Sequence, residues 1–451
     1  MRSKKIAFLF CCVLSMAAIS CKKYLEEKPA ASLVVPSSLP DLQALLDYFP
    51  KMNTNDAGCG DAAADDYYLA HNDWLALSEP LRRTYTWEKE GLFDASTNDW
   101  SRAYERVYFA NTVLEAVEKM GVHAPGTAAG NIKGQALLAR ARSFLQAVII
   151  WSVAYDNNTA ATDLGIPLRL TTDFNQPSVR SSVLQTYRQI IDDLQQALIL
   201  LPVTPLHKMR PSRPAAYALL ARTFLAMRQY GQAGLYADSC LQLYNSLIDF
   251  NSLNASATFP FSQFNAEVIF HSTMTTPASI NNSRAKIDSL LYRSYAANDL
   301  RKLLYFRNNN NGSFAFKGSY DGTGLPFTGI SVAEAYLTRA EASAREGKTS
   351  AAMNDLNTLL LKRWKTGTFV PFTAATAGQA VTLVLQERRK ELLFRGTRWM
   401  DIKRLNREPG AIVLVRNLNG TFFSLQPNSP RYALPIPDDI IDLSGMQQNP
   451  R

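Results

Sequence analysis

Apolar residues recur at three- and four-residue spacing along most of the chain, and this spacing predicts a mainly α-helical protein. The clearest helix is expected over Ser181–Leu201, where either of the first two serines can cap the start and Pro202 ends it. Two other long helices are expected over Asn98–Met120 and about Asn131–Trp151. Asn111 falls on the apolar face of the first, so we expect a buried amide satisfied by neighbouring backbone rather than a ligand contact.

Two later segments repeat each other, each spread over two predicted helices with a turn between them. The matched positions are Ala216, Tyr217, Ala221, Ala233 and Leu241 and, in the same order, Ala335, Tyr336, Ala340, Ala352 and Leu360. This is the size and small-residue pattern of a tetratricopeptide-like helical hairpin, in which alanines let paired helices approach closely. The match is partial, because Gly347 at the turn of the later copy is replaced by Arg228 in the earlier one.

The helical pattern breaks between the two copies, and we predict an irregular, loop-rich insertion at about 245–329. Within it, Leu303–Arg307 and Ser313–Lys317 are predicted to pair as a β-hairpin around the turn at 308–312. A second hairpin is expected over Ile412–Leu425, where the dipeptide Asn-Gly favours a two-residue turn. The predicted fold is therefore mainly α, with helical hairpins, loop-rich insertions and a few short β-hairpins.

An unusual density of charge falls on helices that should be packed, at Glu387–Leu405. Arg388 and Arg395 share the apolar stripe of a helix that begins near Gln379, and Glu391 lies between them on the same face. Because an unpaired buried ion costs several kcal/mol, we expect a hydrogen-bonded network there. We interpret this corner as architectural rather than catalytic.

The same corner contains a predicted break between two helices. Gly396 is expected to end the first helix as its C-terminal cap, and Thr397 is expected to cap the second. The residues predicted to form the structural network are Arg388, Glu391, Arg398 and Asp401.

The first residues predict an export signal. Three basic residues precede the apolar run Ile6–Ile19, which is too short to span a bilayer comfortably, and small residues lead to Cys21. This order resembles a bacterial lipoprotein signal, so residues 1–20 are interpreted as a signal peptide and Cys21 as the lipid-modified first residue of the mature protein. Residues 21–38 then form a tether, and 39–451 are expected to form one helical domain attached to the membrane by its lipid.

Composition excludes some classes of protein. The chain has 451 residues, 47% apolar and 19% charged, which is ordinary for a globular protein. Its formal charge of +9 is scattered and includes no basic stripe with interleaved aromatics, so no nucleic acid partner is expected. Of five cysteines, only Cys59 and Cys240 follow Cys21; a disulfide between them is conceivable in an oxidising compartment but two cysteines form no framework.

The motifs of common enzymes are missing from the sequence. Its four histidines lack metal-ligand spacing, and there is no nucleophile-elbow serine, phosphate-cradling loop or dinucleotide fingerprint. The carboxylate pairs Asp65/Asp66 and Asp192/Asp193 are adjacent in sequence, a poor arrangement for flanking one glycosidic bond. We therefore expect no catalytic residues, metal or cofactor. Carboxylates brought together from distant segments, as in a glycan hydrolase, stay open as an alternative.

Aromatic residues are frequent in the predicted loops, where core packing does not obviously require them. The candidates for ligand binding are Tyr67, Tyr68, Trp74, Tyr85, Trp87, Tyr292, Tyr295 and Tyr320, with Phe314 beside them. Carbohydrate rings present apolar faces that stack on such side chains, while polar neighbours hydrogen-bond the hydroxyls. The competing interpretation is that most of these aromatics are core or loop anchors.

Taken in order, the motifs of the mature chain resemble the SusD/RagB family of outer-membrane nutrient-binding lipoproteins of Bacteroidetes. The segments that carry the resemblance are Cys21–Pro29; Trp100, Tyr104 and Asn111; Ser182–Pro202; Ala333–Gly347; Glu387–Leu392 with Gly396, Arg398, Trp399 and Asp401; Leu434–Pro437; and Gln448–Pro450. One departure is Arg395, where the family commonly has a glutamate, which changes the expected local pairing of the network.

The resemblance implies a mostly helical domain built on tetratricopeptide-like hairpins, with variable loops that carry the ligand site. It also implies a surface-facing, lipid-anchored protein of the outer membrane and a partner, a SusC-like TonB-dependent transporter, over which such a protein acts as a capturing lid. Family ligands are mainly oligosaccharides and sometimes peptides. The expected function is thus non-enzymatic capture of a glycan or other nutrient; a peptide ligand, a glycan hydrolase and a scaffold without a small ligand are the alternatives.

Overall fold

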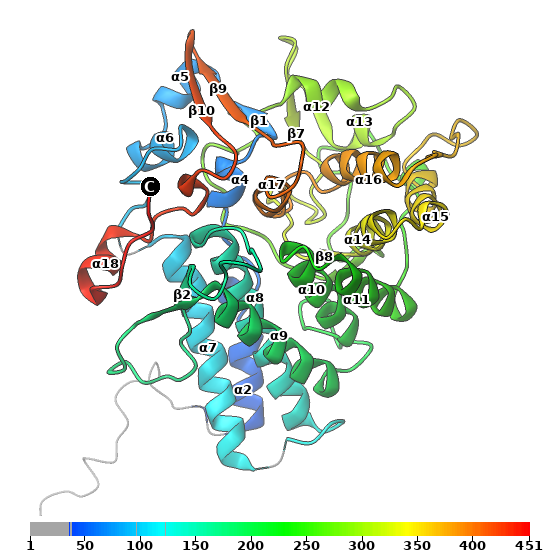
Figure 1. Ribbon diagram of the computed structural model, residues 1–451. Helices are drawn as coiled ribbons and strands as arrows, with labels where there is room; N and C mark the ends of the chain where they lie inside the picture. The colour runs from blue at the N-terminus through cyan, green and yellow to red at the C-terminus, as the bar shows by residue number, and fades with distance from the viewer. Residues whose placement is uncertain (1–35, 37, 96, 122) are drawn as a thin grey trace, which may run out of the picture.

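The computed structural model describes residues 36, 38–95, 97–121 and 123–451. The signal peptide at 1–20, the lipidation site Cys21 and most of the tether at 21–38 lie outside the described residues, so they remain predictions. From Leu39 onward the chain is mainly helical with short strands between helices, which confirms the expected fold class (Figure 1).

Three long helices pack in sequence order, α7 against α8 and α8 against α9 (Figure 1). Their bounds are α7 Asp99–Met120, α8 Ala128–Trp151 and α9 Val183–Leu200. The predictions for all three are confirmed, and their ends follow from local chemistry. Asn98 and Ser101 form a capping box at the start of α7, and Gly121 ends it with a φ of 70°. α8 begins earlier than expected because the Thr127 hydroxyl accepts the Gly130 N–H.

The two predicted helical hairpins are present and stack on each other. Their helices are α10 Arg213–Ala226 with α11 Tyr230–Leu243, and α14 Val332–Arg345 with α15 Thr349–Leu361. α11 packs against α14, so the hairpins adjoin although the insertion separates them in sequence (Figure 1). The matched alanines Ala216, Ala221, Ala335 and Ala340 are buried, which allows this close approach.

The turns of the two hairpins share one backbone conformation. Gly347 has a φ of 78° and Arg228, at the matched position, has a φ of 59°. A side chain in the left-handed region costs about 1 to 2 kcal/mol relative to glycine. The Arg228 guanidinium compensates by donating hydrogen bonds to the carbonyls of Arg407 and Tyr155. The substitution that weakened the sequence repeat therefore leaves the turn unchanged.

The charged corner differs from the expectation in where its first helix ends. α16 spans Ala377–Glu391 and α17 spans Arg398–Leu405, so Arg395 and Gly396 belong to the connecting turn rather than to the helix. The turn includes Phe394 with a φ of 52° and Gly396 with a φ of 71°. Thr397 precedes α17 but makes no side-chain cap hydrogen bond. The two predicted capping roles are therefore wrong, because the apolar residues before Gly396 turn inward instead of continuing the helix.

The strands form five antiparallel pairs of two strands each among the described residues. The pairs are β1 Tyr67–Tyr68 with β5 Lys286–Ile287, β2 Leu164–Pro167 with β3 Arg180–Ser182, β4 Val268–Phe270 with β8 Ile330–Ser331, β6 Phe306–Asn308 with β7 Phe314–Phe316, and β9 Leu414–Leu418 with β10 Thr421–Leu425. Both predicted hairpins are confirmed, although the first two residues of the predicted strand Leu303–Arg307 lie in the short helix α13, Arg301–Leu304. In the β9–β10 hairpin, Asn419 and Gly420 have φ values of 52° and 87°, as a type I′ turn requires.

Short helices connect these parts. They are α2 Leu39–Leu46, α3 Phe49–Met52, α4 Cys59–Ala63, α5 His71–Leu75, α6 Glu79–Tyr85, α12 Ser289–Ser294, α13 Arg301–Leu304 and α18 Asp438–Ser444, with 3-10 turns at Phe250–Ser252 and Pro430–Tyr432. One apolar cluster joins the long helices to the C-terminal segment, and a second packs the insertion against β1 and α6. The insertion at 245–329 therefore shares a buried core with the segments around it despite its irregular backbone.

Buried ion pairs join the charged corner to distant segments. Glu391 accepts from Arg363 at 2.8 Å and from Arg301 at 3.2 Å, so the expected pairing of Glu391 with Arg388 is wrong. Arg388 instead donates to Asp401 at 2.8 Å. The helix spacing suggested a partner within α16, but the partners come from other elements because α16 faces them across the core.

Arg398 of the predicted network and Arg395, the departure from the family pattern, are held in two different ways. Arg398 donates to both oxygens of Asp65, at 2.7 and 2.8 Å. The guanidinium of Arg395 lies over the ring of Tyr320, at 3.8 Å from its centroid, and takes no carboxylate partner that the structure records. An arginine at this position is therefore accommodated by stacking rather than by an ion pair.

Three further observations concern the described part of the chain. Cys59 and Cys240 are both buried free thiols. No helix there combines the length and the apolar character needed to cross a bilayer. No group of three or more histidine, cysteine or carboxylate side chains lies close enough together to hold a metal ion among these residues.

Candidate functional site

Five of the eight aromatic candidates lie in the interior. They are Tyr67, Tyr85, Trp87, Tyr295 and Tyr320. The expectation that these rings offer an exposed stacking surface is wrong for these five, because each ring is covered by protein. Tyr68 is exposed, with 37% of its surface accessible, and Trp74 and Tyr292 are partly exposed.

Three of the buried rings surround one cation. The guanidinium of Arg416, on β9, lies 4.9, 4.2 and 5.3 Å from the ring centroids of Tyr67, Tyr85 and Trp87. It donates to the carbonyls of Tyr67 and Ala64, so its charge is held by rings and backbone. We call these three rings and Arg416 the arginine cage.

The short helix α4 holds the cage from beneath. The Tyr67 hydroxyl donates to the Ala62 carbonyl at 2.6 Å, and Trp87 Nε1 donates to the Ala63 carbonyl at 2.9 Å. With the bond from Arg416 to Ala64, three successive carbonyls at the end of α4 each accept from one member of the cage. The rings are therefore fixed as structural parts and cannot turn outward without breaking these bonds.

The other candidate aromatics are also committed to protein contacts. The Tyr295 hydroxyl donates to the Lys390 carbonyl at 2.8 Å, and Tyr320 carries the Arg395 guanidinium on its face. Tyr292 stacks on Phe314 with ring centroids 3.6 Å apart. Trp74 stacks against the imidazole of His71 at 5.9 Å. The competing interpretation of the sequence, that most loop aromatics are anchors, holds for this group.

A groove of about 790 Å³ lies above the arginine cage, and we call it the hairpin groove. The β9–β10 hairpin, β1, the start of α5, the start of α12 and one side chain of α16 bound it. Its lining residues are Asp65, Tyr67, Tyr68, Leu69, Ala70, His71, Tyr85, Asp288, Leu290, Arg389, Val413, Val415, Arg416, Asn417, Asn419 and Gly420. Of these residues, only the tyrosines were predicted from the sequence as ligand contacts; the asparagines could have been found from the predicted Asn-Gly turn.

The two carboxylates in the hairpin groove already have partners. Asp65 binds Arg398 at 2.7 Å and Arg389 at 3.3 Å. Burial would raise the pKa of Asp65, but the guanidiniums outweigh it and hold that pKa below its usual range. Asp288 caps α12 by accepting the Leu291 N–H at 2.8 Å. Asp65 is thereby held as a fixed anion, which suits binding and positioning better than proton transfer.

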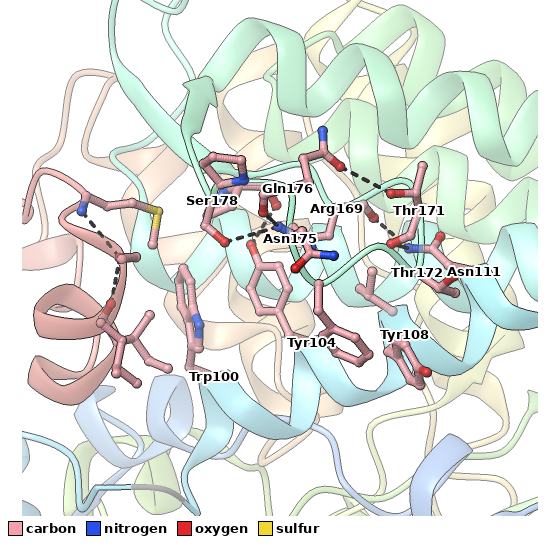
Figure 2. Close-up of a pocket in the computed structure, with 18 residues that line it drawn as sticks. Trp100, Tyr104, Tyr108, Asn111, Arg169, Thr171, Thr172, Asn175, Gln176 and Ser178 are labelled. Atoms are coloured by element: carbon pink, nitrogen blue, oxygen red, sulfur yellow. Dashed lines mark hydrogen bonds between the residues drawn. The ribbon is translucent and has the colours of Figure 1, made fainter. Parts of the chain in front are cut away.

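A second groove, of about 530 Å³, lies over α7, and we call it the helix groove (Figure 2). Trp100, Tyr104 and Tyr108 project from α7 toward the loop at 169–178, and α18 forms the opposite wall. Phe174, in that loop, pairs with Tyr108 at 5.1 Å between ring centroids. Within this set, Trp100 is buried in the core, Tyr104 is partly buried and Tyr108 is exposed. The four-residue spacing that continues to Tyr108 was the signal for an aromatic row.

Asn111 lies at the edge of the helix groove and is fully buried. Its amide nitrogen donates to the Arg169 carbonyl at 2.9 Å, and its oxygen accepts from Arg140 at 3.0 Å. The prediction of a buried amide satisfied by neighbouring backbone is confirmed. Its function is to hold the loop at 169–178 against α7.

Two family models match the chain. Residues 23–225 match a family described as starch-binding associating with outer membrane, and residues 253–451 match the SusD family. No curated protein is significantly similar in sequence.

Solved structures share the fold along nearly the whole length. A SusD superfamily protein of Bacteroides thetaiotaomicron has 22% identity and a TM-score of 0.73 over 92% of this chain and 100% of that one. A SusD-like carbohydrate binding protein of Bacteroides vulgatus has 22% identity and a TM-score of 0.66, covering 91% and 97%. A laminarin binding SusD-like protein has 17% identity and a TM-score of 0.64, covering 91% and 97%.

Proposed function

Because the chain belongs to the SusD/RagB family, we propose that it captures an oligosaccharide at the outer membrane and passes it to a TonB-dependent transporter. It is a binding protein without catalytic activity. Two solved relatives are named for binding carbohydrate and laminarin, which supports a glycan as the ligand class.

The hairpin groove is the proposed capture site. Its size is in the range of small-ligand sites, and it mixes apolar surface with a few polar groups. Tyr68 offers its ring, while Leu290, Val413 and Val415 add exposed apolar surface. This exposed ring beside an open groove is the observation that carries the proposal.

Polar groups around Tyr68 suit the hydroxyls of a sugar. Asn417 and Asn419 are exposed on the hairpin, and Arg389 is partly exposed across the groove. Amides both donate and accept, whereas the guanidinium only donates, so together they can bind hydroxyl groups in several orientations. Because the arginine cage fixes the floor, the ligand meets a preformed surface.

The attachment of the protein follows from the start of the chain. In this proposal Cys21 carries the lipid, residues 21–38 form the tether, and 39–451 form one domain at the cell surface. A SusC-like transporter is the proposed partner. Labelling with radioactive palmitate tests the anchor: wild-type protein should incorporate label, and Cys21→Ser should not.

Calorimetry with neutral hexasaccharides tests the ligand site. Laminarihexaose, maltohexaose and cellohexaose are titrated into the wild type, Tyr68→Ala and Tyr48→Ala. Loss of the Tyr68 ring should weaken binding about fivefold, since ring contacts are worth about 1 kcal/mol. Tyr48 is similarly exposed but lies outside both grooves, so its variant should bind as the wild type does.

The alternatives predict different results. Binding of a peptide library with no response to any saccharide would replace the glycan by a peptide ligand. Release of shorter products from the hexasaccharides by pure protein would replace capture by hydrolysis. Equal affinity of the wild type and Tyr68→Ala for every bound saccharide would remove the hairpin groove from the proposal.

A further inference from the structure

We propose that the helix groove is a second saccharide-binding site, which takes an uncharged sugar unit. No residue lines both grooves, so the two sites are separate. The inference rests on the proposed glycan-binding function for its ligand class. It stands on three features of the helix groove: an aromatic row, a rigidly held loop and a lining with a single charged side chain.

The aromatic row comes from α7. Trp100, Tyr104 and Tyr108 are four residues apart, so their rings lie on one face and advance about 6 Å along the helix per step. Trp100 and Tyr104 lie 4.8 Å apart between ring centroids, and the Tyr104 hydroxyl donates to the Pro167 carbonyl at 2.8 Å. The row is therefore fixed in place (Figure 2). Trp100 is only 3% exposed and Tyr104 is partly buried, so Tyr108, with 40% of its surface accessible, is the ring of the row that a sugar can reach. An exposed ring face of this kind stacks on the apolar faces of sugars.

A chain of buried polar groups holds the loop at 169–178. Asp193 on α9 binds Arg140 at 2.8 and 2.7 Å, and Arg140 in turn binds the Asn111 oxygen. Asn111 then donates to the carbonyls of Arg169 and Thr171. Three helices thus cooperate to fix the start of one surface loop, which is more than a simple connection needs.

Further bonds fix the rest of the loop. Both carboxylate oxygens of Glu115 accept from Thr172, one from its N–H and one from its hydroxyl, each at 2.7 Å. The Arg169 guanidinium donates to the carbonyls of Gln176 and Asp173 across the loop. The loop thereby holds Phe174 outward with 79% of its surface exposed. A large apolar side chain held exposed on an ordered loop is typical of a ligand contact.

The helix groove has a single charged side chain among the described residues that line it. This is Arg169, whose guanidinium donates to carbonyls of the loop itself. Ser178 and Ser444 bring hydroxyls, and Asn175 and Gln176 bring amides. Thr171 donates to Gln176 Oε1, and the structure shows no acceptor for Gln176 Nε2. Rings with neutral hydroxyl and amide groups match an uncharged sugar better than an acidic glycan or a peptide with charged ends.

The test places a fluorescent reporter in the loop of the full chain. In Phe174→Trp, the new indole is expected to be exposed, because Phe174 itself is. The variant and the wild type are each titrated with laminarihexaose, maltohexaose, cellohexaose and xylohexaose. The difference between their emission spectra isolates the new indole, and its emission should change with at least one of the four saccharides. Tyr108→Ala in the reporter background should weaken that response at least fivefold. Phe422→Ala, which removes an exposed ring outside both grooves, should leave it unchanged.

The two sites are separated by adding Tyr68→Ala to the reporter. A reporter response that survives Tyr68→Ala supports an independent second site. Binding that depends on Tyr68 while the reporter stays silent overturns the second site and leaves the proposed function intact. A reporter response without any binding that depends on Tyr68 moves capture to the helix groove. A response only to apolar peptides, or to none of the four hexasaccharides, overturns the inference.

Discussion

In the hairpin groove, three aromatic rings lie beneath the surface around Arg416, whereas in the helix groove the rings of Tyr108 and Phe174 reach solvent. The two grooves also differ in the number of charged side chains that line them. Arginine and aspartate side chains line the hairpin groove, but the helix groove has a single arginine whose donors are used by its own loop. The two surfaces are thus built from similar residue types with opposite exposure.

This contrast shows what decides the use of an aromatic residue. A ring beside a buried cation gains cation–π energy and supports the fold, so it is lost as a stacking surface. A ring on a helix face without such a cation can stay open if a loop is held beside it. The position of the nearest buried cation therefore indicates better than the number of loop aromatics whether a ring can stay open to a ligand.

The largest expected effect comes from breaking the arginine cage. Arg416→Ala leaves a cavity among three rings and two buried carbonyls without donors, and should lower the free energy of unfolding by roughly 4 kcal/mol. Arg416→Met fills part of the cavity but supplies no donors, so it should lower the free energy of unfolding by less than Arg416→Ala does. Urea denaturation measures both. The exposed control Arg293→Ala should stay within about 0.5 kcal/mol of the wild type, and equal stability of Arg416→Ala would disprove the cage.

The second effect is a pH dependence of stability that comes from Asp61. Burial raises the pKa of Asp61, on α4, to about 7. Between about pH 4 and pH 7 the folded state therefore keeps a proton that the unfolded state has released, so the free energy of unfolding falls as pH rises. The total loss should be roughly 4 kcal/mol.

Asp61→Asn removes this titration. Urea denaturation at pH 5 and pH 8 should show that the variant gains stability relative to the wild type as pH rises. The exposed control Asp442→Asn should follow the wild-type profile. If the wild type and Asp61→Asn differed in unfolding free energy by the same amount at pH 5 and pH 8, the pH dependence would not come from Asp61.

A third, smaller effect concerns the loop of the helix groove. Asn111→Ala removes the donor to the Arg169 and Thr171 carbonyls and the acceptor of Arg140, which should cost roughly 2 kcal/mol. Amide hydrogen exchange across 169–178 should accelerate, while the β9–β10 hairpin keeps its wild-type protection. Lys119→Ala, an exposed change on the same helix, serves as the control. Equal acceleration in both regions would mean global destabilisation instead of local release.

The smallest effect on stability is expected at the exposed rings themselves. Tyr68→Ala and Phe174→Ala should each change the free energy of unfolding by less than about 0.5 kcal/mol. Each should nevertheless weaken binding in its own groove only, as calorimetry of the single and double variants can show. Non-additive losses in the double variant would mean that the grooves bind one ligand jointly.

Local chemistry made much of the fold predictable. The capping box before α9, the small residues of the hairpins and the Asn-Gly turn each act within a few residues, so periodicity and turn rules located them. The end of α16 was missed because Phe394 takes a left-handed conformation that only the core around it stabilises. Such a tertiary effect leaves no local pattern in the sequence.

The sites were less predictable, because their partners are far apart in the chain. Nothing near Arg416 in the sequence indicates that Tyr67 and Tyr85 surround it, and Arg398 binds Asp65 across a similar separation. Only the row Trp100, Tyr104 and Tyr108 had a local signal, which is its four-residue spacing.

The shared turn of the two helical hairpins has a consequence for engineering. Gly347 adopts its conformation freely, whereas Arg228 holds the same conformation by bonds to Arg407 and Tyr155, which belong to other elements. The α14–α15 turn is therefore portable and the α10–α11 turn is not. A designer who wishes to lengthen the stack should copy the later turn, since the earlier one would bring an arginine without its hydrogen-bond partners.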